Sequence, residues 1–119
     1  MKGLTMTNKL VDKECVPCRG DAPKLDQEQI AHYLAGVPQW QMVETDGVNK
    51  IFRIFKFKNF AEALKFTDQV GELAEQAGHH PDILLQWGKV TVTWYSHKIG
   101  GLHENDFIMA ARTDRLYEA

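Results

Sequence analysis

The segment from Asn59 to Gly78 constrains the fold most, because it reads as one long amphipathic helix with a clear signal at each end. Asn59 is a residue type that caps helix N-termini, and Glu62 follows three residues later. Gly78 supplies a C-terminal stop. Between them, residues recur at the spacing of one helical face over about five turns: Phe60, Ala63, Leu64, Thr67, Val70, Leu73, Ala74 and Ala77. Strand patterns lie on both sides of this helix.

Two strand pairs flank the central helix. Residues 40–45 and 48–57 form the first pair and turn at Asp46-Gly47, a dipeptide that tolerates the positive φ of a tight hairpin. Residues 83–86 and 89–97 form the second pair and turn near Trp87-Gly88. In the last strand, one face carries Val90, Val92 and Trp94, and the other carries Thr91, Thr93, Tyr95 and His97. We assign Trp87 and Trp94 to packing, as is usual for strand aromatics.

A short helix precedes the first hairpin, and a longer one follows the second. Asp26 is the expected N-cap of the first helix, Gln29 occupies the capping-box position, and Gly36 ends it. The last helix is expected from about Asn105 to Leu116. The order α-β-β-α-β-β-α predicts an α+β fold, with a four-stranded antiparallel sheet and helices packed on one face. The 119 residues are enough for one domain, placed at 23–119.

Residues 1–22 read as a flexible N-terminal extension, polar and interrupted by Pro17 and Gly20. They contain the two cysteines, Cys15 and Cys18. No strand precedes this pair, as a redox dithiol would need, and a structural zinc takes four ligands. We interpret them as two reduced cysteines, with a zinc shared between two chains as the alternative.

Charge and hydropathy exclude several classes of function. With 14 basic and 16 acidic residues, the chain has no overall attraction to nucleic acid or to an anionic membrane. No apolar run reaches the roughly 20 residues of a membrane span, and no signal peptide is apparent, so a cytoplasmic location is expected. Strand 48–57 has apolar side chains on both faces, and a small sheet leaves two edges to cover. We therefore expect a homo-oligomer.

Four of the five histidines lie between Glu75 and Asp106: His79, His80, His97 and His103. Imidazole is the side chain whose unperturbed pKa lies nearest neutrality, so such a cluster suits proton transfer. Pro81 favours an extended His80, which should point His79 and His80 to opposite sides. A metal site is the minor alternative, since no HExxH pair fixes two ligands on one face, and a structural role is the other. We leave His32 and His103 with structural roles. No phosphate-binding loop or nucleophile elbow occurs.

The same stretch carries a specific resemblance. Glu75, then His79-His80-Pro81-Asp82, Trp87, His97 and Asp106 stand at the spacing of the pterin-4a-carbinolamine dehydratases, and the chain resembles that family from about Leu25 to Leu116, including FKNFAEAL and GKVTVTW. One departure is Gly101-Leu102-His103, where many members have Gly-Leu-Thr, and it bears on the capping of the last helix.

The resemblance implies a hydro-lyase that dehydrates 4a-hydroxytetrahydrobiopterin to quinonoid dihydropterin, using histidines as acids and bases and no cofactor or metal. It assigns His80 to substrate binding and the base role, and His79 and His97 to the acid roles. Substrate-binding positions implied by the resemblance are Trp40, Glu75, Pro81, Ser96, Lys98, Ile99 and Asp106. Glu75 and Asp106 match acidic residues that can orient a histidine.

The resemblance also implies partners. Such an enzyme recycles the pterin of phenylalanine hydroxylase, and family members form dimers or tetramers. The alternative function is a non-enzymatic regulatory or oligomerisation partner of a hydroxylase or of a transcription factor, as relatives also bind a homeodomain protein. The chain has no basic stripe for direct contact with nucleic acid. The histidine set favours the enzyme.

Overall fold

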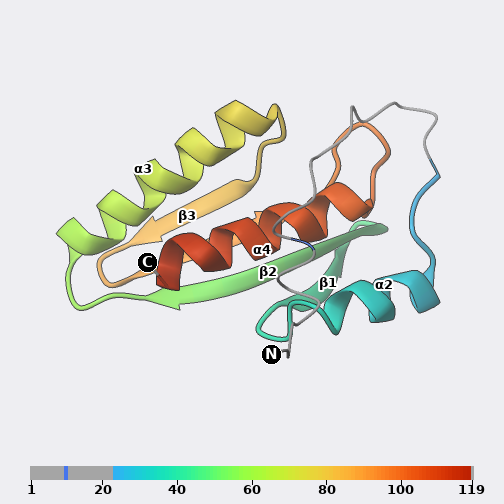
Figure 1. Cartoon of the computed structure of the whole chain (residues 1–119), viewed down its shortest axis with the longest axis horizontal. Helices are drawn as coiled ribbons and strands as arrows, with labels where there is room; N and C mark the ends of the chain where they lie inside the picture. The colour runs from blue at the N-terminus through green and yellow to red at the C-terminus, as the bar shows by residue number, and fades with distance from the viewer. Residues whose placement is uncertain (1–9, 11–22, 119) are drawn as a thin grey trace.

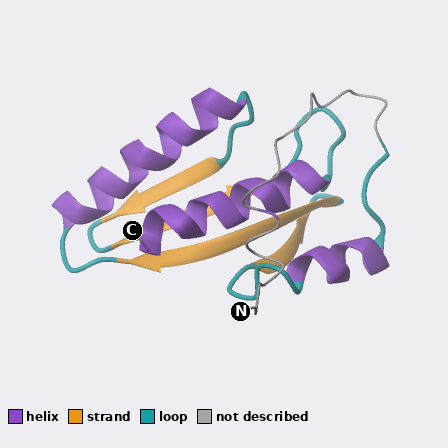
Figure 2. Cartoon of the chain, viewed as in Figure 1, coloured by secondary structure: helices purple, strands orange, loops and turns teal. Residues whose placement is uncertain are grey.

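The computed structural model describes Leu10 and residues 23–118, and its elements follow the predicted order (Figures 1 and 2). They are α2 (Gln27–Leu34), β1 (Gln41–Thr45), β2 (Val48–Lys56), α3 (Phe60–Ala77), β3 (Asp82–Gln86), β4 (Lys89–Trp94) and α4 (Glu104–Glu118). The predicted α+β class is confirmed. The predictions for Cys15, Cys18 and the rest of the extension lie outside the described residues, apart from Leu10, which is buried in the core.

The two hairpins join into one antiparallel sheet of order β1-β2-β4-β3. Strands β2 and β4 pair in the middle, with Ile51 opposite Trp94 and Phe55 opposite Val90. Asp46 and Gly47 both have positive φ, 54° and 80°, as the tight turn between β1 and β2 requires. The central pairing fixes which side chains of β2 and β4 face the helices.

Helices α3 and α4 cover one face of the sheet (Figure 1). The core lies between these layers, where the alternation of strand side chains buries Ile51 and Phe55 of β2 and Val92 and Trp94 of β4. The opposite face has no helix over it in the described structure and leaves apolar side chains exposed. They are Val43, Ile54 and Leu84.

Helix α4 is buried on nearly all sides over its first two turns. Residues 105–111 are all buried, because α4 lies on the sheet and contacts both α2 and α3. A helix in such a position can hold polar side chains inside the protein only when they have partners. Two aspartates of α4, Asp106 and Asp114, meet this condition in different ways.

Three expectations need correction. Strand β4 ends at Trp94 rather than residue 97, because Ser96 pairs with Gly101 and the chain closes a turn over residues 96–101. Trp87 does not pack inside: it lies at the hairpin turn and is 68% exposed. Helix α4 runs from Glu104 to Glu118, slightly longer than predicted at both ends.

Candidate active site

The end of α3 places the histidine pair. Gly78 leaves the helix in the left-handed conformation (φ 67°), and the backbone N–H of His79 donates to the Ala74 carbonyl at 3.2 Å. This bond across the helix end is typical of a glycine-terminated helix and fixes the direction in which the chain leaves. His79 is thereby turned inward, 9% exposed, with its ring stacked on Trp94 at 5.5 Å between ring centres.

Asp106 is the buried partner of His79. Its carboxylate is fully buried and accepts three hydrogen bonds: from Nε2 of His79 at 2.6 Å, from Oγ of Ser96 at 2.8 Å and from the backbone N–H of His103 at 2.9 Å. A buried carboxylate is costly unless it is paired and hydrogen-bonded, and here three donors meet it. The network therefore fixes the orientation of the His79 ring.

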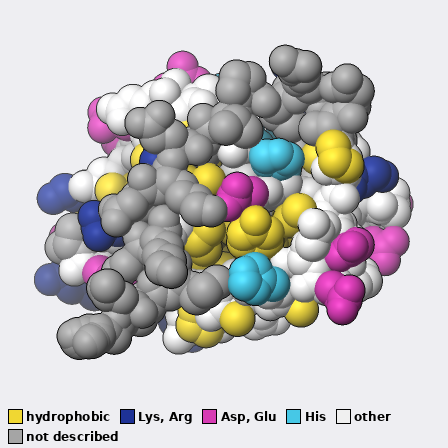
Figure 3. All heavy atoms as spheres, turned by 45° about the vertical axis from the view of Figure 1, so that its right-hand side comes forward, with side chains coloured by type: hydrophobic (Ala, Val, Ile, Leu, Met, Phe, Trp, Pro, Cys, Tyr) yellow, Lys and Arg dark blue, Asp and Glu magenta, His cyan; other side chains and the backbone are white. Residues whose placement is uncertain are grey.

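The other two site histidines lie at the surface beside this network. Nε2 of His80 donates to the Glu75 carboxylate at 2.5 Å, and both side chains are exposed. Nε2 of His97 donates to the backbone carbonyl of His80 at 3.2 Å, while the His97 ring lies 4.3 Å from that of Tyr95. His79 and His80 thus have separate partners, as their predicted divergence requires. Figure 3 shows one face of the molecule, with histidine side chains at its surface near apolar and acidic ones.

All three site histidines have Nε2 occupied by a hydrogen bond within the protein, which leaves Nδ1 as the second nitrogen of each. Among the described residues, the His79 ring forms its hydrogen bond through Nε2 and none through Nδ1. No buried side-chain nitrogen or oxygen of the described residues lacks a partner, so Nδ1 of His79 reaches the surface. Each ring can therefore exchange a proton with a ligand through Nδ1 while Nε2 holds it in place.

The structure brings together most of the predicted site residues: His79, His80, His97, Glu75, Ser96 and Asp106. Pro81 directly follows His80, and Lys98 and Ile99 belong to the turn that follows Ser96; Lys98 is exposed and Ile99 is buried. Their contacts with a ligand stay predictions.

Trp40 lies in a different buried group. Its Nε1 donates to the Asp114 carboxylate at 2.9 Å, and Arg53 donates to the same oxygen at 2.6 Å. Burial raises the pKa of the Asp114 carboxyl above its ordinary value, against the opposing effects of the Trp40 hydrogen bond and the Arg53 charge. None of these contacts joins Trp40 to a histidine, so its predicted place in a pterin pocket stays a prediction.

His103 has a structural role, as expected from the sequence, and that role is to cap the last helix. The residue stands just before α4, where its Nδ1 accepts a hydrogen bond from the backbone N–H of Asn105 at 3.1 Å. The Asp106 carboxylate accepts in return from the His103 N–H, so the two side chains cap the helix start together, although His103 accepts from Asn105 and not from residue 106 as in a capping box. The spacing of residues 103 and 106 was the available signal, but histidine is not among the usual capping residues.

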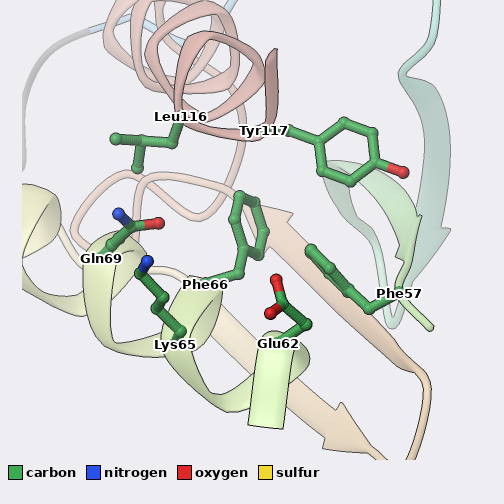
Figure 4. Close-up of a pocket in the computed structure, with 7 residues that line it drawn as sticks. All are labelled: Phe57, Glu62, Lys65, Phe66, Gln69, Leu116 and Tyr117. Carbon is green, nitrogen blue, oxygen red and sulfur yellow. The ribbon is translucent and has the colours of Figure 1, made fainter. Parts of the chain in front are cut away.

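A surface hollow of about 300 Å³ lies away from the histidines, between the first half of α3 and the last turn of α4 (Figure 4). Phe57, Phe66 and Tyr117 gather there, and Glu62, Lys65 and Gln69 lie along its α3 side. The hollow contains none of the predicted site residues. Among Leu10 and residues 23–118, no three histidine, cysteine or acidic side chains are placed to hold one metal ion. No helix in this part of the chain is long and apolar enough to cross a membrane.

The fold and this site define an α+β protein with a cluster of histidines, two of which bond to carboxylates. A model of the pterin 4 alpha carbinolamine dehydratase family matches residues 23–116, most of the chain. The chain therefore belongs to the pterin-4a-carbinolamine dehydratase family, whose named activity is that of a hydro-lyase.

Relatives and solved structures agree. Two proteins provisionally named pterin-4-alpha-carbinolamine dehydratase are similar along nearly their whole length. That of Nitrosococcus oceani is 56% identical over 103 residues, 87% of this chain and 91% of that one. That of Marinobacter nauticus is 53% identical over 110 residues, 92% and 99%.

Two solved structures share the fold. The transcriptional coactivator/pterin dehydratase of Brucella melitensis has a TM-score of 0.71 at 32% identity, covering 79% of this chain and 98% of that one. A pterin dehydratase-like protein described as a RuBisCO assembly factor in the alpha-carboxysome has a TM-score of 0.58 at 26% identity, covering 68% and 92%.

Proposed function

We propose that this protein dehydrates 4a-hydroxytetrahydrobiopterin to quinonoid dihydropterin and water by histidine acid–base catalysis. The observation that carries the proposal is the position of His79. Its Nε2 is held by the buried Asp106, its Nδ1 is not a buried atom without a partner, and His97 bonds to the backbone carbonyl of the next residue, His80. Family membership supplies the class of substrate.

The reaction moves two protons and no electrons to or from an external carrier. An acid protonates the departing 4a-hydroxyl, the C4a–O bond breaks, and water leaves. A base takes the proton from the adjacent ring nitrogen, and that nitrogen forms a double bond to C4a. Each group placed to give or take a proton contributes roughly 10²- to 10⁴-fold in rate. No redox partner or cofactor enters this balance.

We assign His80 to substrate binding and the base role, and His79 and His97 to the acid roles on the two faces of the pterin. Glu75 supports the role of His80, because a carboxylate that accepts from Nε2 leaves Nδ1 with its lone pair free. Asp106 supports His79 by accepting from Nε2 and fixing the orientation of the ring. The carbonyl of His80 orients His97.

The test is the decay of the carbinolamine, generated by a phenylalanine hydroxylase and followed by its ultraviolet absorbance. Wild-type protein should accelerate the decay, and His79→Ala, His80→Ala and His97→Ala should each lose most of the acceleration. His32→Ala is the matched control, since His32 is exposed on α2 and takes no part in the network. Near-normal turnover by His80→Ala alone would contradict its assigned role, and no acceleration by wild type would contradict the function.

The proposed physiological setting is the recycling of tetrahydrobiopterin for phenylalanine hydroxylase, because that class of hydroxylase releases the carbinolamine. A coupled hydroxylation assay at limiting pterin tests this setting. Added protein should sustain hydroxylation where the carbinolamine otherwise accumulates. An unchanged rate of pterin turnover would speak against the link.

A homo-oligomer is part of the proposal, and a binding role is the second candidate function. Both are supported by β1 and β3, which are the edge strands of the sheet formed by the described residues, and by the exposed Val43, Ile54 and Leu84 on the opposite face from α3 and α4. The two structural neighbours are described as a coactivator and as an assembly factor, which favours a partner-binding role in addition to the enzymatic activity. Light scattering at micromolar concentration should give a dimer or tetramer, and a monodisperse monomer would contradict the oligomer.

A further inference from the structure

The cap of α4 and the orientation of His79 share one carboxylate. Oδ2 of Asp106 accepts from the backbone N–H of His103 and from Ser96, while Oδ1 accepts from His79. Asp106 belongs to the first turn of α4, so its position depends on how that turn is held. The cap that holds the turn is the bond from the Asn105 N–H to Nδ1 of His103.

The imidazole can make this cap in only one protonation state. An N-cap side chain must accept a hydrogen bond, and Nδ1 accepts only when the ring is neutral with its proton on Nε2. A second proton would remove the acceptor and place a positive charge at the helix N-terminus, where the backbone dipole disfavours it. A hydroxyl cap has no such dependence on pH.

We propose that His103 is a positioning residue for His79: as a neutral N-cap it holds the first turn of α4, and with it the Asp106 carboxylate, where that carboxylate orients the His79 ring. On protonation His103 would lose this cap and place a positive charge beside Asp106, the carboxylate that holds His79. Only the predicted effect on kcat and KM rests on the proposed function.

The charged and titratable groups around His103 come from three segments. Asp106 and Glu104 belong to α4, and His79 follows α3. Lys24, which precedes α2, lies against Gly101, two residues before His103. Asp106 bonds both to the backbone N–H of His103 and to Nε2 of His79, so a charge on His103 would act on the carboxylate that holds His79.

The chain offers a matched control for the cap. Asp26 and Gln29 form a capping box at the start of α2, with both bonds at 2.9 Å, and they belong to no part of the site. Asp26→Ala therefore removes a cap without touching Asp106. His103→Thr replaces the imidazole by a hydroxyl cap, and His103→Ala removes the cap.

The experiment records the imidazole nitrogen and carbon signals of His79 by NMR from pH 5 to 8, together with kcat and KM for the carbinolamine. At neutral pH, His103→Ala should change the His79 tautomer signals and lower kcat by about 10- to 100-fold, the cost of a misplaced catalytic group. His103→Thr should restore both. At acid pH, His103→Thr should keep the signals of a His79 ring bonded to Asp106, whereas wild type should lose them.

Two results would overturn the inference: unchanged His79 signals in His103→Ala, or equal changes in Asp26→Ala. Where His103→Ala does not fold, wild type and His103→Thr are compared at acid pH, and identical His79 titrations overturn it. The NMR readout needs no substrate. A His79 response without carbinolamine turnover by wild type would leave the positioning role standing while the proposed function fails.

Discussion

Helix α4 carries two buried aspartates, eight residues and about 12 Å apart, with opposite surroundings. Asp106 accepts from a histidine, a serine and a backbone N–H, and its histidine partner reaches the surface through its other nitrogen. Asp114 accepts from Arg53 and Trp40. Arginine keeps its charge at any ordinary pH, whereas histidine gains and loses a proton near neutrality.

The difference shows that a buried carboxylate is not in itself a sign of catalysis. At Asp114 the partner cannot exchange a proton, so the pair ties α4 to β2 and the residue before β1. At Asp106 the partner is a histidine, which can exchange a proton with a ligand, as the proposed acid–base catalysis requires. The neighbours reinforce the contrast: a second histidine, His103, bonds to Asp106 through its backbone N–H at the first site, whereas Phe55 and Tyr117 lie against Arg53 at the second.

The largest expected effect is on catalysis at the Asp106 end. His79→Ala and Asp106→Ala should each lower kcat by about 10²- to 10⁴-fold, and the double variant should lose little more than either one, because the two residues act as a unit. Steady-state kinetics of carbinolamine decay measure the three losses, with circular dichroism as the folding control. Losses that multiply in the double variant would mean that the residues act separately.

Stability should fall at the Asp114 end. Asp114→Ala leaves the buried Nε1–H of Trp40 and the guanidinium of Arg53 without their acceptor, at a cost of about 1.5–3 kcal/mol in the free energy of unfolding. Urea unfolding measures this cost, and kcat should be unchanged. A higher KM with unchanged kcat would place Trp40 in the pterin pocket, as the family resemblance implies.

The smallest expected effect is the pH dependence that Asp114 contributes. Because burial raises the pKa of Asp114 in the folded protein, the folded state holds this proton to a higher pH than the unfolded state does. Stability is therefore lost as the pH rises from about 4 through the raised pKa. The unfolding free energy of wild type should fall relative to that of Asp114→Asn over this range. A difference that stays constant with pH would contradict the raised pKa.

Local signals explain how much of this could be predicted from the sequence. Asp26 and Asn59 cap their helices as expected, and Asp46-Gly47 forms the first turn, since each depends on residues within four positions. The separate directions of His79 and His80 followed from Pro81 in the same way.

The misses depend on tertiary packing or on unusual chemistry. Asp114 bonds to Trp40 and Arg53, which lie 74 and 61 residues away, and no local pattern announces such pairs. Trp87 is a residue type that usually packs inside a protein, but it occupies a turn at the surface. His103 caps a helix, a role usually performed by a hydroxyl, amide or carboxylate side chain. The sequence therefore indicated a structural role for His103 without showing which one.

The most direct test of the catalytic role of the histidine end compares two isosteric variants, Asp106→Asn and Asp114→Asn, with wild type in one assay of carbinolamine decay at neutral pH. We predict acceleration by wild type and by Asp114→Asn, and loss of most of it in Asp106→Asn, whose amide has one acceptor oxygen for the three donors that meet the carboxylate. Full acceleration by a folded Asp106→Asn, or none by wild type, would contradict the assignment of catalysis to this end of the molecule.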